Sequence, residues 1–140
     1  MSARKKVFLG GTCNESTWRD RLIPTLEIDY FNPVVEDWTP DCMEEELRQR
    51  ALCDYCLYTI TPRMTGVYSI AEVVDDSNKH PEKTILVLLN SEIVDDWPCM
   101  FDIGQWTSLQ AVARMVKSNG GQVFENLVNA AHYMNNEATA

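Results

Sequence analysis

The segment from Lys83 to Leu89, Lys-Thr-Ile-Leu-Val-Leu-Leu, constrains the fold more than any other part of the chain. Its apolar residues follow one another without the alternation expected of a strand that has one face in water. Nearly continuous apolar strands are typical of parallel sheets, in which helices cover both faces. The segment therefore predicts an inner strand of a parallel sheet with a layer of helices on each side.

Strands and helices alternate along the rest of the chain. Further strands are predicted at Lys5–Leu9, Ile28–Phe31, Tyr55–Ile60 and Gln122–Phe124. The segments between them carry apolar residues at helical spacings of three and four. This order predicts an α/β fold, a three-layer sandwich of Rossmann-like or flavodoxin-like type with a mostly parallel five-stranded sheet. A chain of 140 residues fits a single domain that spans residues 1–140.

Local signals set the expected ends of the helices. Pro24 shortens or kinks the first helix. The capping-box pattern Asp41–Glu44 predicts a second helix that runs to about Cys53. Its expected buried stripe consists of Met43, Leu47 and Ala51. Thr107 is expected to cap a later helix.

Charge and cysteine content exclude several classes of protein. The formal net charge of -9 disfavours binding to nucleic-acid polymers, which are themselves negative. The five cysteines include one CxxC pair, Cys53 and Cys56, without the second pair of a zinc site. No segment reaches the roughly 20 apolar residues needed to span a bilayer. We therefore expect a cytoplasmic protein with reduced cysteines, no metal or organic cofactor and no membrane partner.

Glu72 is the principal candidate for chemistry. It follows the loop after the predicted strand Tyr55–Ile60, and ligands of open α/β sheets bind beyond the carboxyl ends of the strands. Ser69 and Glu72 match a capping box, in which the carboxylate only satisfies a backbone N–H. In the alternative interpretation Glu72, expected in the first helical turn, is ionised by the helix N-terminus and attacks the anomeric carbon of a ribose. Gly66 in the same loop allows close approach of a ligand.

Glu46, Arg50 and Asp54 stand four residues apart, and so they share one face of the predicted second helix. They form either a solvated, salt-bridged face or the partner carboxylates of Glu72, with Arg50 keeping both acids ionised.

Further candidates lie near other strand ends. Gly10, Gly11 and Thr12 offer N–H groups to a sugar or phosphate, or form only a tight turn. Asn32 can bond a ribose, although Asn-Pro turns also occur for structural reasons. Tyr68 and Trp38 are candidates to line the pocket and stack on a base, whereas Trp18 has the spacing of a core residue. The histidines, His80 and His132, are expected at the surface.

Four segments resemble the nucleoside 2-deoxyribosyltransferase family and its nucleotide N-glycosidase relatives. They are Lys6–Thr12, Asp29–Pro33, the stretch from Glu46 to Tyr55, and Gly66–Glu72, and the resemblance covers about residues 6–90. It implies that Glu72 is a nucleophile that displaces a nucleobase from C1′ to give a covalent glycosyl-enzyme. It also implies that Glu46 stands where relatives carry a catalytic Asp, that Asp54 organises the site, and that Phe8 replaces a Tyr of some transferases.

The sequence thus predicts glycosyl transfer or hydrolysis at the N-glycosidic bond of a (2′-deoxy)nucleoside or nucleotide. Gly10, Gly11, Thr12, Asn32, Gly66 and Tyr68 are expected at the sugar, and Trp38 near the base. Because relatives complete the pocket from a neighbouring subunit, a homodimer or larger homo-oligomer is expected. The alternatives are a catalytically silent nucleotide-binding sensor domain, an NAD-type glycohydrolase, and an interaction domain in which Glu72 only caps its helix.

Overall fold

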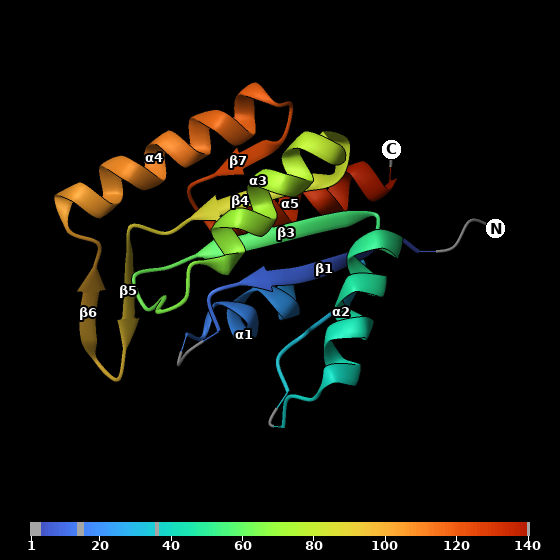
Figure 1. Ribbon diagram of the computed structural model, residues 1–140, viewed down its shortest axis with the longest axis horizontal. Coiled ribbons are helices and arrows are strands. Elements are labelled where there is room, and N and C mark those ends of the chain that lie inside the picture. Colours follow the sequence, from blue (N-terminus) through green and yellow to red (C-terminus); the bar gives the residue numbers. More distant parts are fainter. Residues whose placement is uncertain (1–3, 14–15, 36, 140) are drawn as a thin grey trace.

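Five parallel strands form the central sheet of the computed structural model, which describes residues 4–13, 16–35 and 37–139. They are β1 (Lys6–Gly11), β2 (Asp29–Phe31), β3 (Tyr55–Ile60), β4 (Thr84–Leu88) and β7 (Gln122–Phe124). Their order is β2-β1-β3-β4-β7, and every pairing in this sheet is parallel (Figure 1). The predicted five-stranded α/β fold is confirmed, and the order is that of flavodoxin-like sheets.

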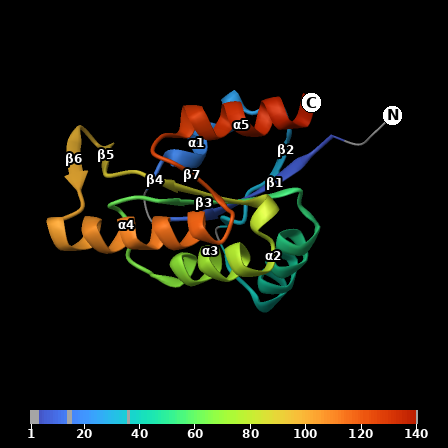
Figure 2. The same ribbon diagram turned by 90° about the horizontal axis from the view of Figure 1, so that it is seen from above.

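Helices cover both faces of the sheet. Figure 2 shows α1 (Trp18–Leu22) and α5 (Leu127–Thr139) on one side, and α2 (Pro40–Leu52), α3 (Tyr68–Lys79) and α4 (Ile103–Ser118) on the other. Side chains of one strand alternate between two cores, so that Leu57 joins the α1/α5 core and Tyr58 joins the opposite one. All five residues of β4 are buried, as its continuous apolar sequence predicts.

The first helix is short, in agreement with the prediction from Pro24. After Leu22 the chain continues as a 3₁₀ turn, η1 (Ile23–Thr25), with Pro24 near its start. Trp18 is completely buried in the core, so it is not available to stack on a ligand. A second 3₁₀ turn, η2 (Pro81–Lys83), leads into β4.

A two-stranded antiparallel hairpin that the sequence pattern did not predict follows β4. It consists of β5 (Ser91–Val94) and β6 (Trp97–Met100) and lies at the carboxyl-end side of the sheet (Figure 1). Asp95 and Asp96 form its turn with φ of 52° and 65°. Two positive φ angles are the mark of a type I′ turn, which usually carries Asn-Gly or Asp-Gly. The Asp-Asp sequence therefore gave no hairpin signal.

Two predicted helix starts are wrong. α2 begins at Pro40 after Thr39 without a side-chain cap, because proline is already suited to the first helical position. Its predicted stripe is also wrong, since Met43 and Leu47 are about half exposed and Gln49 is buried instead. α4 begins before Thr107, where Asp102 and Gln105 form a reciprocal capping box.

Neither a membrane span nor a metal-binding cluster occurs among the described residues. None of their helices is long and apolar enough to cross a bilayer, and no three of their His, Cys, Asp or Glu side chains are placed to hold a metal ion. All five cysteines are free. The two thiols of the CxxC pair point to different partners, because Cys53 donates to the side chain of Gln49 and Cys56 to the backbone carbonyl of Arg50.

Candidate active site

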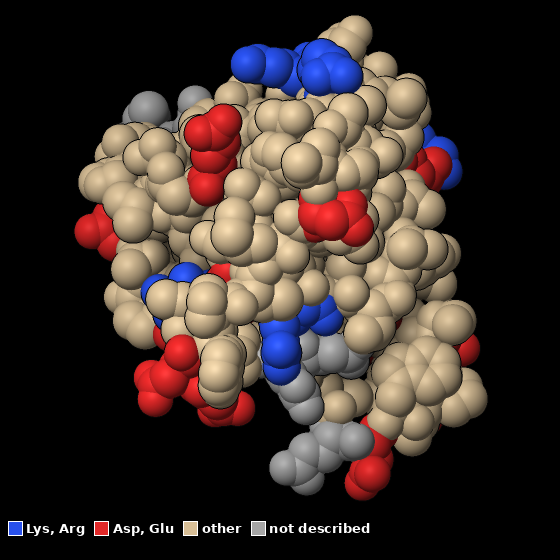
Figure 3. Space-filling model, turned by 90° about the vertical axis from the view of Figure 1, so that its left-hand side faces the viewer, with Lys and Arg blue, Asp and Glu red and all other residues tan. Residues whose placement is uncertain are grey.

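A cavity of about 180 Å³ lies beyond the carboxyl ends of β1 and β3. Three segments line it: Gly11, Thr12 and Cys13 after β1, Ile60 at the end of β3, and Met64, Thr65, Gly66, Tyr68, Ser69 and Glu72 before and within α3. In a sheet of this order, β1 and β3 flank the point where the winding direction reverses, and ligands bind there. Figure 3 shows this side of the molecule, on which separated acidic and basic side chains interrupt a largely uncharged surface.

Glu72 lines this cavity from the second turn of α3, one turn later than predicted. The helix starts after Val67 without a side-chain cap, so the Ser69–Glu72 capping box does not form. The Glu72 carboxylate instead lies 3.4 Å from Nη1 of Arg50 on α2, with 17% of the side chain exposed. Its orientation is therefore set by a tertiary contact.

Arg50 connects Glu72 to a second carboxylate that sequence reasoning missed. Nη2 of Arg50 donates to Oδ1 of Asp76 at 2.8 Å, and the hydroxyl of the buried Tyr58 donates to Oδ2 of Asp76 at 2.5 Å. The available signal was spacing, because Glu72 and Asp76 stand four apart on α3, as Glu46 and Arg50 do on α2. Four side chains from three elements thus form one buried polar network.

Burial dominates the electrostatics of both predicted catalytic glutamates. It raises the pKa of Glu72, Arg50 opposes this rise, and the charges of Asp76 and Glu46 add to it. Burial likewise raises the pKa of Glu46 against the influence of Arg50. The predicted lowering of the Glu72 pKa by the helix N-terminus is wrong in direction, because the effect fades beyond the first turn. Arg50 was predicted to keep Glu46 and Asp54 ionised, but at Glu46 desolvation outweighs the influence of Arg50 on the pKa.

The loop after β1 is fixed by a buried arginine that carried no recognisable sequence signal. Arg19 on α1 donates from Nε to the carbonyl of Leu9 at 3.1 Å and from Nη1 to that of Thr12 at 2.7 Å. Nε1 of Trp18 reaches the same Thr12 carbonyl at 2.8 Å. Burial lowers the pKa of Arg19, partly offset by Cys13. These bonds set the backbone of one wall of the cavity.

Two of the glycines in this region serve different purposes. Gly11 lines the cavity with φ of +115°, and a Cβ there would lie 2.2 Å from the backbone oxygen of Thr59. Gly10 was predicted at the cavity but does not line it. A Cβ on Gly10 would lie 2.6 Å from the ring of Tyr58. It is a packing position. Thr12 lines the cavity, and its hydroxyl oxygen accepts a hydrogen bond from the backbone N–H of Thr61 at 3.0 Å.

The opposite wall is more open. Gly66 lines it with no atom within 4 Å of a hypothetical Cβ, and Tyr68, 73% exposed, lines it as well. Cys13, which follows directly after Gly11 and Thr12, also lines the cavity.

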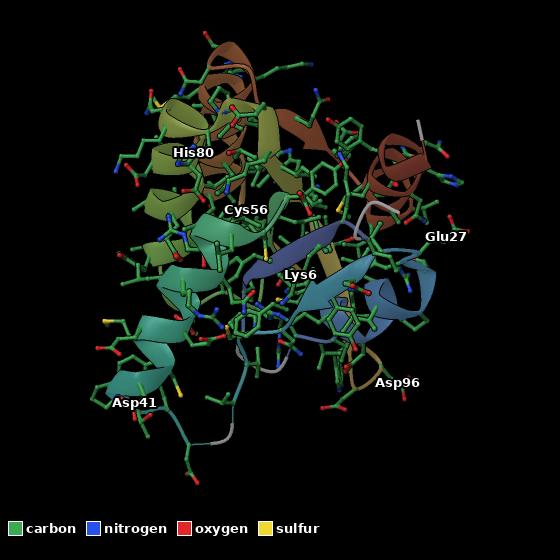
Figure 4. All side chains as sticks on the ribbon, turned by 90° about the vertical axis from the view of Figure 1, so that its right-hand side faces the viewer. Lys6, Glu27, Asp41, Cys56, His80 and Asp96 are labelled. Atoms are coloured by element: carbon green, nitrogen blue, oxygen red, sulfur yellow. The ribbon has the colours of Figure 1, made fainter. Side chains whose placement is uncertain are left out.

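Five predicted site residues do not line the cavity: Gly10, Asn32, Trp38, Glu46 and Asp54. α2 ends at Leu52, so Asp54 leaves the helical face that was predicted to align it with Glu46. Its Oδ2 accepts a hydrogen bond from the backbone N–H of Lys6 at 2.9 Å. Figure 4 shows Lys6 on the amino-end side of the sheet. The six residues of β3, roughly 20 Å of strand, therefore separate Asp54 from the cavity.

Asn32 and Trp38 follow β2. Oδ1 of Asn32 accepts a hydrogen bond from the backbone N–H of Val34 at 3.1 Å, so its side chain stabilises a local turn. Trp38 is 54% exposed, and neither residue belongs to the cavity lining. The predicted surface positions of His80 and His132 are confirmed, since both are exposed.

Comparison with protein families agrees with this geometry. The model of the family described as "Nucleoside 2-deoxyribosyltransferase like" matches residues 4–90. The chain belongs to this family. The matched part of this nucleoside 2-deoxyribosyltransferase-like protein contains every residue that lines the cavity and the whole Tyr58–Asp76–Arg50–Glu72 network. Comparison with curated proteins gives no match.

Proposed function

We propose that this protein cleaves or transfers the N-glycosidic bond of a (2′-deoxy)nucleoside or nucleotide, with Glu72 as the nucleophile. The observation that carries the proposal is the position of Glu72, whose carboxylate lines a cavity at the carboxyl ends of β1 and β3 and does not cap its own helix. Family membership supports the same class of substrate.

The reaction proceeds by two displacements at C1′. An oxygen of Glu72 forms a bond to C1′ as the C1′–N bond breaks, and the base departs with the bonding electron pair and takes up a proton. Water or a second base then attacks C1′ and releases the Glu72 carboxylate. Two inversions give overall retention.

Glu46 is the proposed acid that protonates the departing base. It lies one turn before Arg50 on α2, and its charge acts on Glu72. Burial raises its pKa, which suits a group that must hold a proton before it gives it away. Asp54 is assigned no role in catalysis because it lies at the amino ends of the strands, away from the cavity.

The dimensions of the cavity favour binding of the sugar in its closed part. Its volume of about 180 Å³ is below the roughly 300–1,000 Å³ typical of sites that enclose a whole drug-sized ligand. Gly11 and Thr12 form the wall around the sugar, and Gly66 lies on the more open side. The base is expected at the open side, next to the exposed ring of Tyr68.

The test is incubation with a set of nucleosides and nucleotides, with and without a second free base, followed by chromatography of the released bases. Glu72→Gln is expected to lower the rate by at least about a thousandfold. Glu45→Gln is the matched control, because Glu45 is an exposed carboxylate paired with Arg48 on the surface of α2. A 2′-fluorinated substrate, which slows both displacements, is expected to leave a glycosyl adduct on Glu72 detectable by mass spectrometry.

Two outcomes contradict the proposal. Undiminished turnover in Glu72→Gln removes the nucleophile assignment. Tight nucleotide binding by the wild type without release of any base supports the sensor domain instead. The predicted homodimer stays a prediction, which sedimentation of the same preparation measures.

A further inference from the structure

We propose that Asp76 is a positioning residue that acts on Glu72 through Arg50, and that Tyr58 holds Asp76 in place for this task. The effect of Asp76 on the reaction rate rests on the proposed function, whereas its effect on the ionisation of Glu72 does not. Asp76 does not line the cavity; it reaches Glu72 through the guanidinium that the two carboxylates share and through the effect of its own charge.

The two contacts of Arg50 are unequal. Nη2 lies 2.8 Å from Oδ1 of Asp76, a charge-assisted hydrogen bond, whereas Nη1 lies 3.4 Å from Oε2 of Glu72, beyond the usual range of such a bond. Asp76 therefore fixes the position of the guanidinium, whereas the positive charge of the guanidinium acts on Glu72 without a short hydrogen bond. A carboxylate oxygen that is not tightly bonded keeps its lone pairs available for attack.

The position of Arg50 depends on these carboxylates. Its Nε is buried without a hydrogen-bond partner among the described residues. Removal of the Asp76 charge therefore weakens the bond that holds Nη2 and leaves Glu72 and Glu46 as the charged partners of the guanidinium. The guanidinium is then expected to move toward the nucleophile and bond it directly.

Tyr58 fixes the other end of the network. Its side chain is completely buried, its ring fits against Gly10, and its hydroxyl occupies the second oxygen of Asp76. With only 8% of the Asp76 side chain exposed, water has little access to replace these partners. The rigid strand β3 thus determines where the guanidinium sits.

The charged groups that act on Glu72 are Arg50 and Glu46 on α2 and Asp76 on α3. Tyr58 and Cys56 on β3 interact with Asp76, and Cys13 after β1 lines the same cavity as Glu72. Asp76 opposes ionisation of Glu72 and Arg50 favours it. Asp76→Asn removes the first influence and strengthens the second. Both changes lower the pKa of Glu72.

The decisive experiment is a titration of the Glu72 carboxyl by ¹³C NMR in glutamate-labelled protein, with the signal assigned by its loss in Glu72→Gln. In Asp76→Asn the midpoint is expected to move to lower pH. The acid limb of the pH–rate profile is expected to move in the same direction. The limiting rate is expected to fall about tenfold, the effect of one charge-assisted hydrogen bond on the attacking group.

Asp75→Asn is the matched control. Asp75 is the neighbouring residue, carries the same charge and pairs with Lys79 at the surface of α3. Its replacement is expected to leave the Glu72 midpoint and the pH–rate profile where they are in the wild type. Equal midpoints in the wild type and Asp76→Asn overturn the inference, as does an equal shift in both variants.

Tyr58→Phe decides the question if Asp76→Asn does not fold. The phenylalanine ring keeps the packing on Gly10, while the freed oxygen of Asp76 competes with Glu72 for the guanidinium. The Glu72 midpoint is then expected to move to higher pH, and an unchanged midpoint contradicts the role of the network. Absence of base release from the wild type refutes the proposed function alone, because the NMR titration needs no turnover.

Discussion

Two arginines on opposite faces of the sheet, the buried Arg19 and the largely buried Arg50, have opposite surroundings. Arg19 on α1 donates mainly to backbone carbonyls of the loop after β1, whereas Arg50 on α2 faces the carboxylates of Glu72 and Asp76. Burial lowers the pKa of Arg19. It also acts to lower that of Arg50, but Tyr58, Asp76 and Glu72 outweigh it and the pKa rises.

The difference separates two tasks near one cavity. Carbonyl groups do not titrate, so the bonds of Arg19 hold the shape of a wall at any pH at which the protein is folded. Carboxylates do titrate, so the bonds of Arg50 set charge as well as position. A buried arginine is therefore informative about function only once its acceptors are known.

Replacement of Arg19 is expected to have the largest effect on stability. Arg19→Met leaves the buried carbonyls of Leu9 and Thr12 without these donors, which costs about 3 kcal/mol in the free energy of unfolding. Urea unfolding at pH 5 and pH 7.5 measures it. The loss is expected to be the same at both values, and a loss that varies strongly between them contradicts the assignment of Arg19 to neutral acceptors.

Arg50→Met sharpens the contrast, with an expected loss of about 2 kcal/mol at neutral pH, since both partners are partly exposed. Arg50 opposes the rise in the pKa of Glu72, so without the guanidinium this pKa rises further and protonation relieves an unpaired charge. The destabilisation is therefore expected to be smaller at pH 5 than at pH 7.5 in the same urea experiment. Equal losses of stability at both pH values would contradict the assignment of Arg50 to titratable acceptors.

Gly10→Ala tests the packing that supports the Arg50 side of this comparison. The added methyl group meets the ring of Tyr58, and such overpacking costs about 1–3 kcal/mol. Gly66→Ala is its control, because open space surrounds that position and its φ is not positive. Thermal unfolding is expected to show a clear loss for Gly10→Ala and little change for Gly66→Ala; similar behaviour of the two would place Gly10 outside the Tyr58 contact.

The smallest expected effect is the pH dependence of stability in Glu72→Gln. A carboxyl whose pKa is raised by folding binds more protons in the native state, so the stability it contributes falls as pH rises from its unfolded value through its folded one. Glutamine has no such penalty. The variant is therefore expected to gain stability relative to the wild type between pH 4 and neutral pH, and a relative loss over this range is inconsistent with the raised pKa.

The central sheet was predictable because burial on both faces leaves a direct trace in sequence. Tyr55–Ile60 is buried at every position and has the predicted bounds. The edge strand Gln122–Phe124 also has the predicted bounds, although its residues are exposed or only partly buried. The hairpin and the start of α4 were not predictable in this way, since their signals are single polar residues such as Asp95 and Asp102 whose local role depends on backbone angles.

The site was predictable only where it follows from strand ends. Gly11, Thr12, Gly66, Tyr68 and Glu72 lie at the expected edge of the sheet and line the cavity. Arg19 and Asp76 act through contacts between elements, which spacing alone does not specify. The position of Asp54 was predicted wrongly because residues four apart share a face only while the helix continues, and α2 ends at Leu52.

The hydrogen bond between Ser16 Oγ and Glu92 Oε1, 2.6 Å long, connects β5 to the start of α1. Glu92 lies just past residue 90, where the family match ends, and its carboxylate also accepts a bond from the backbone N–H of Thr17. Truncation after residue 90 would thus remove the hydrogen bonds of Glu92 to the start of α1, and it would also remove β7, which pairs with β4. The smallest unit expected to fold on its own is consequently longer than the segment that matches the family.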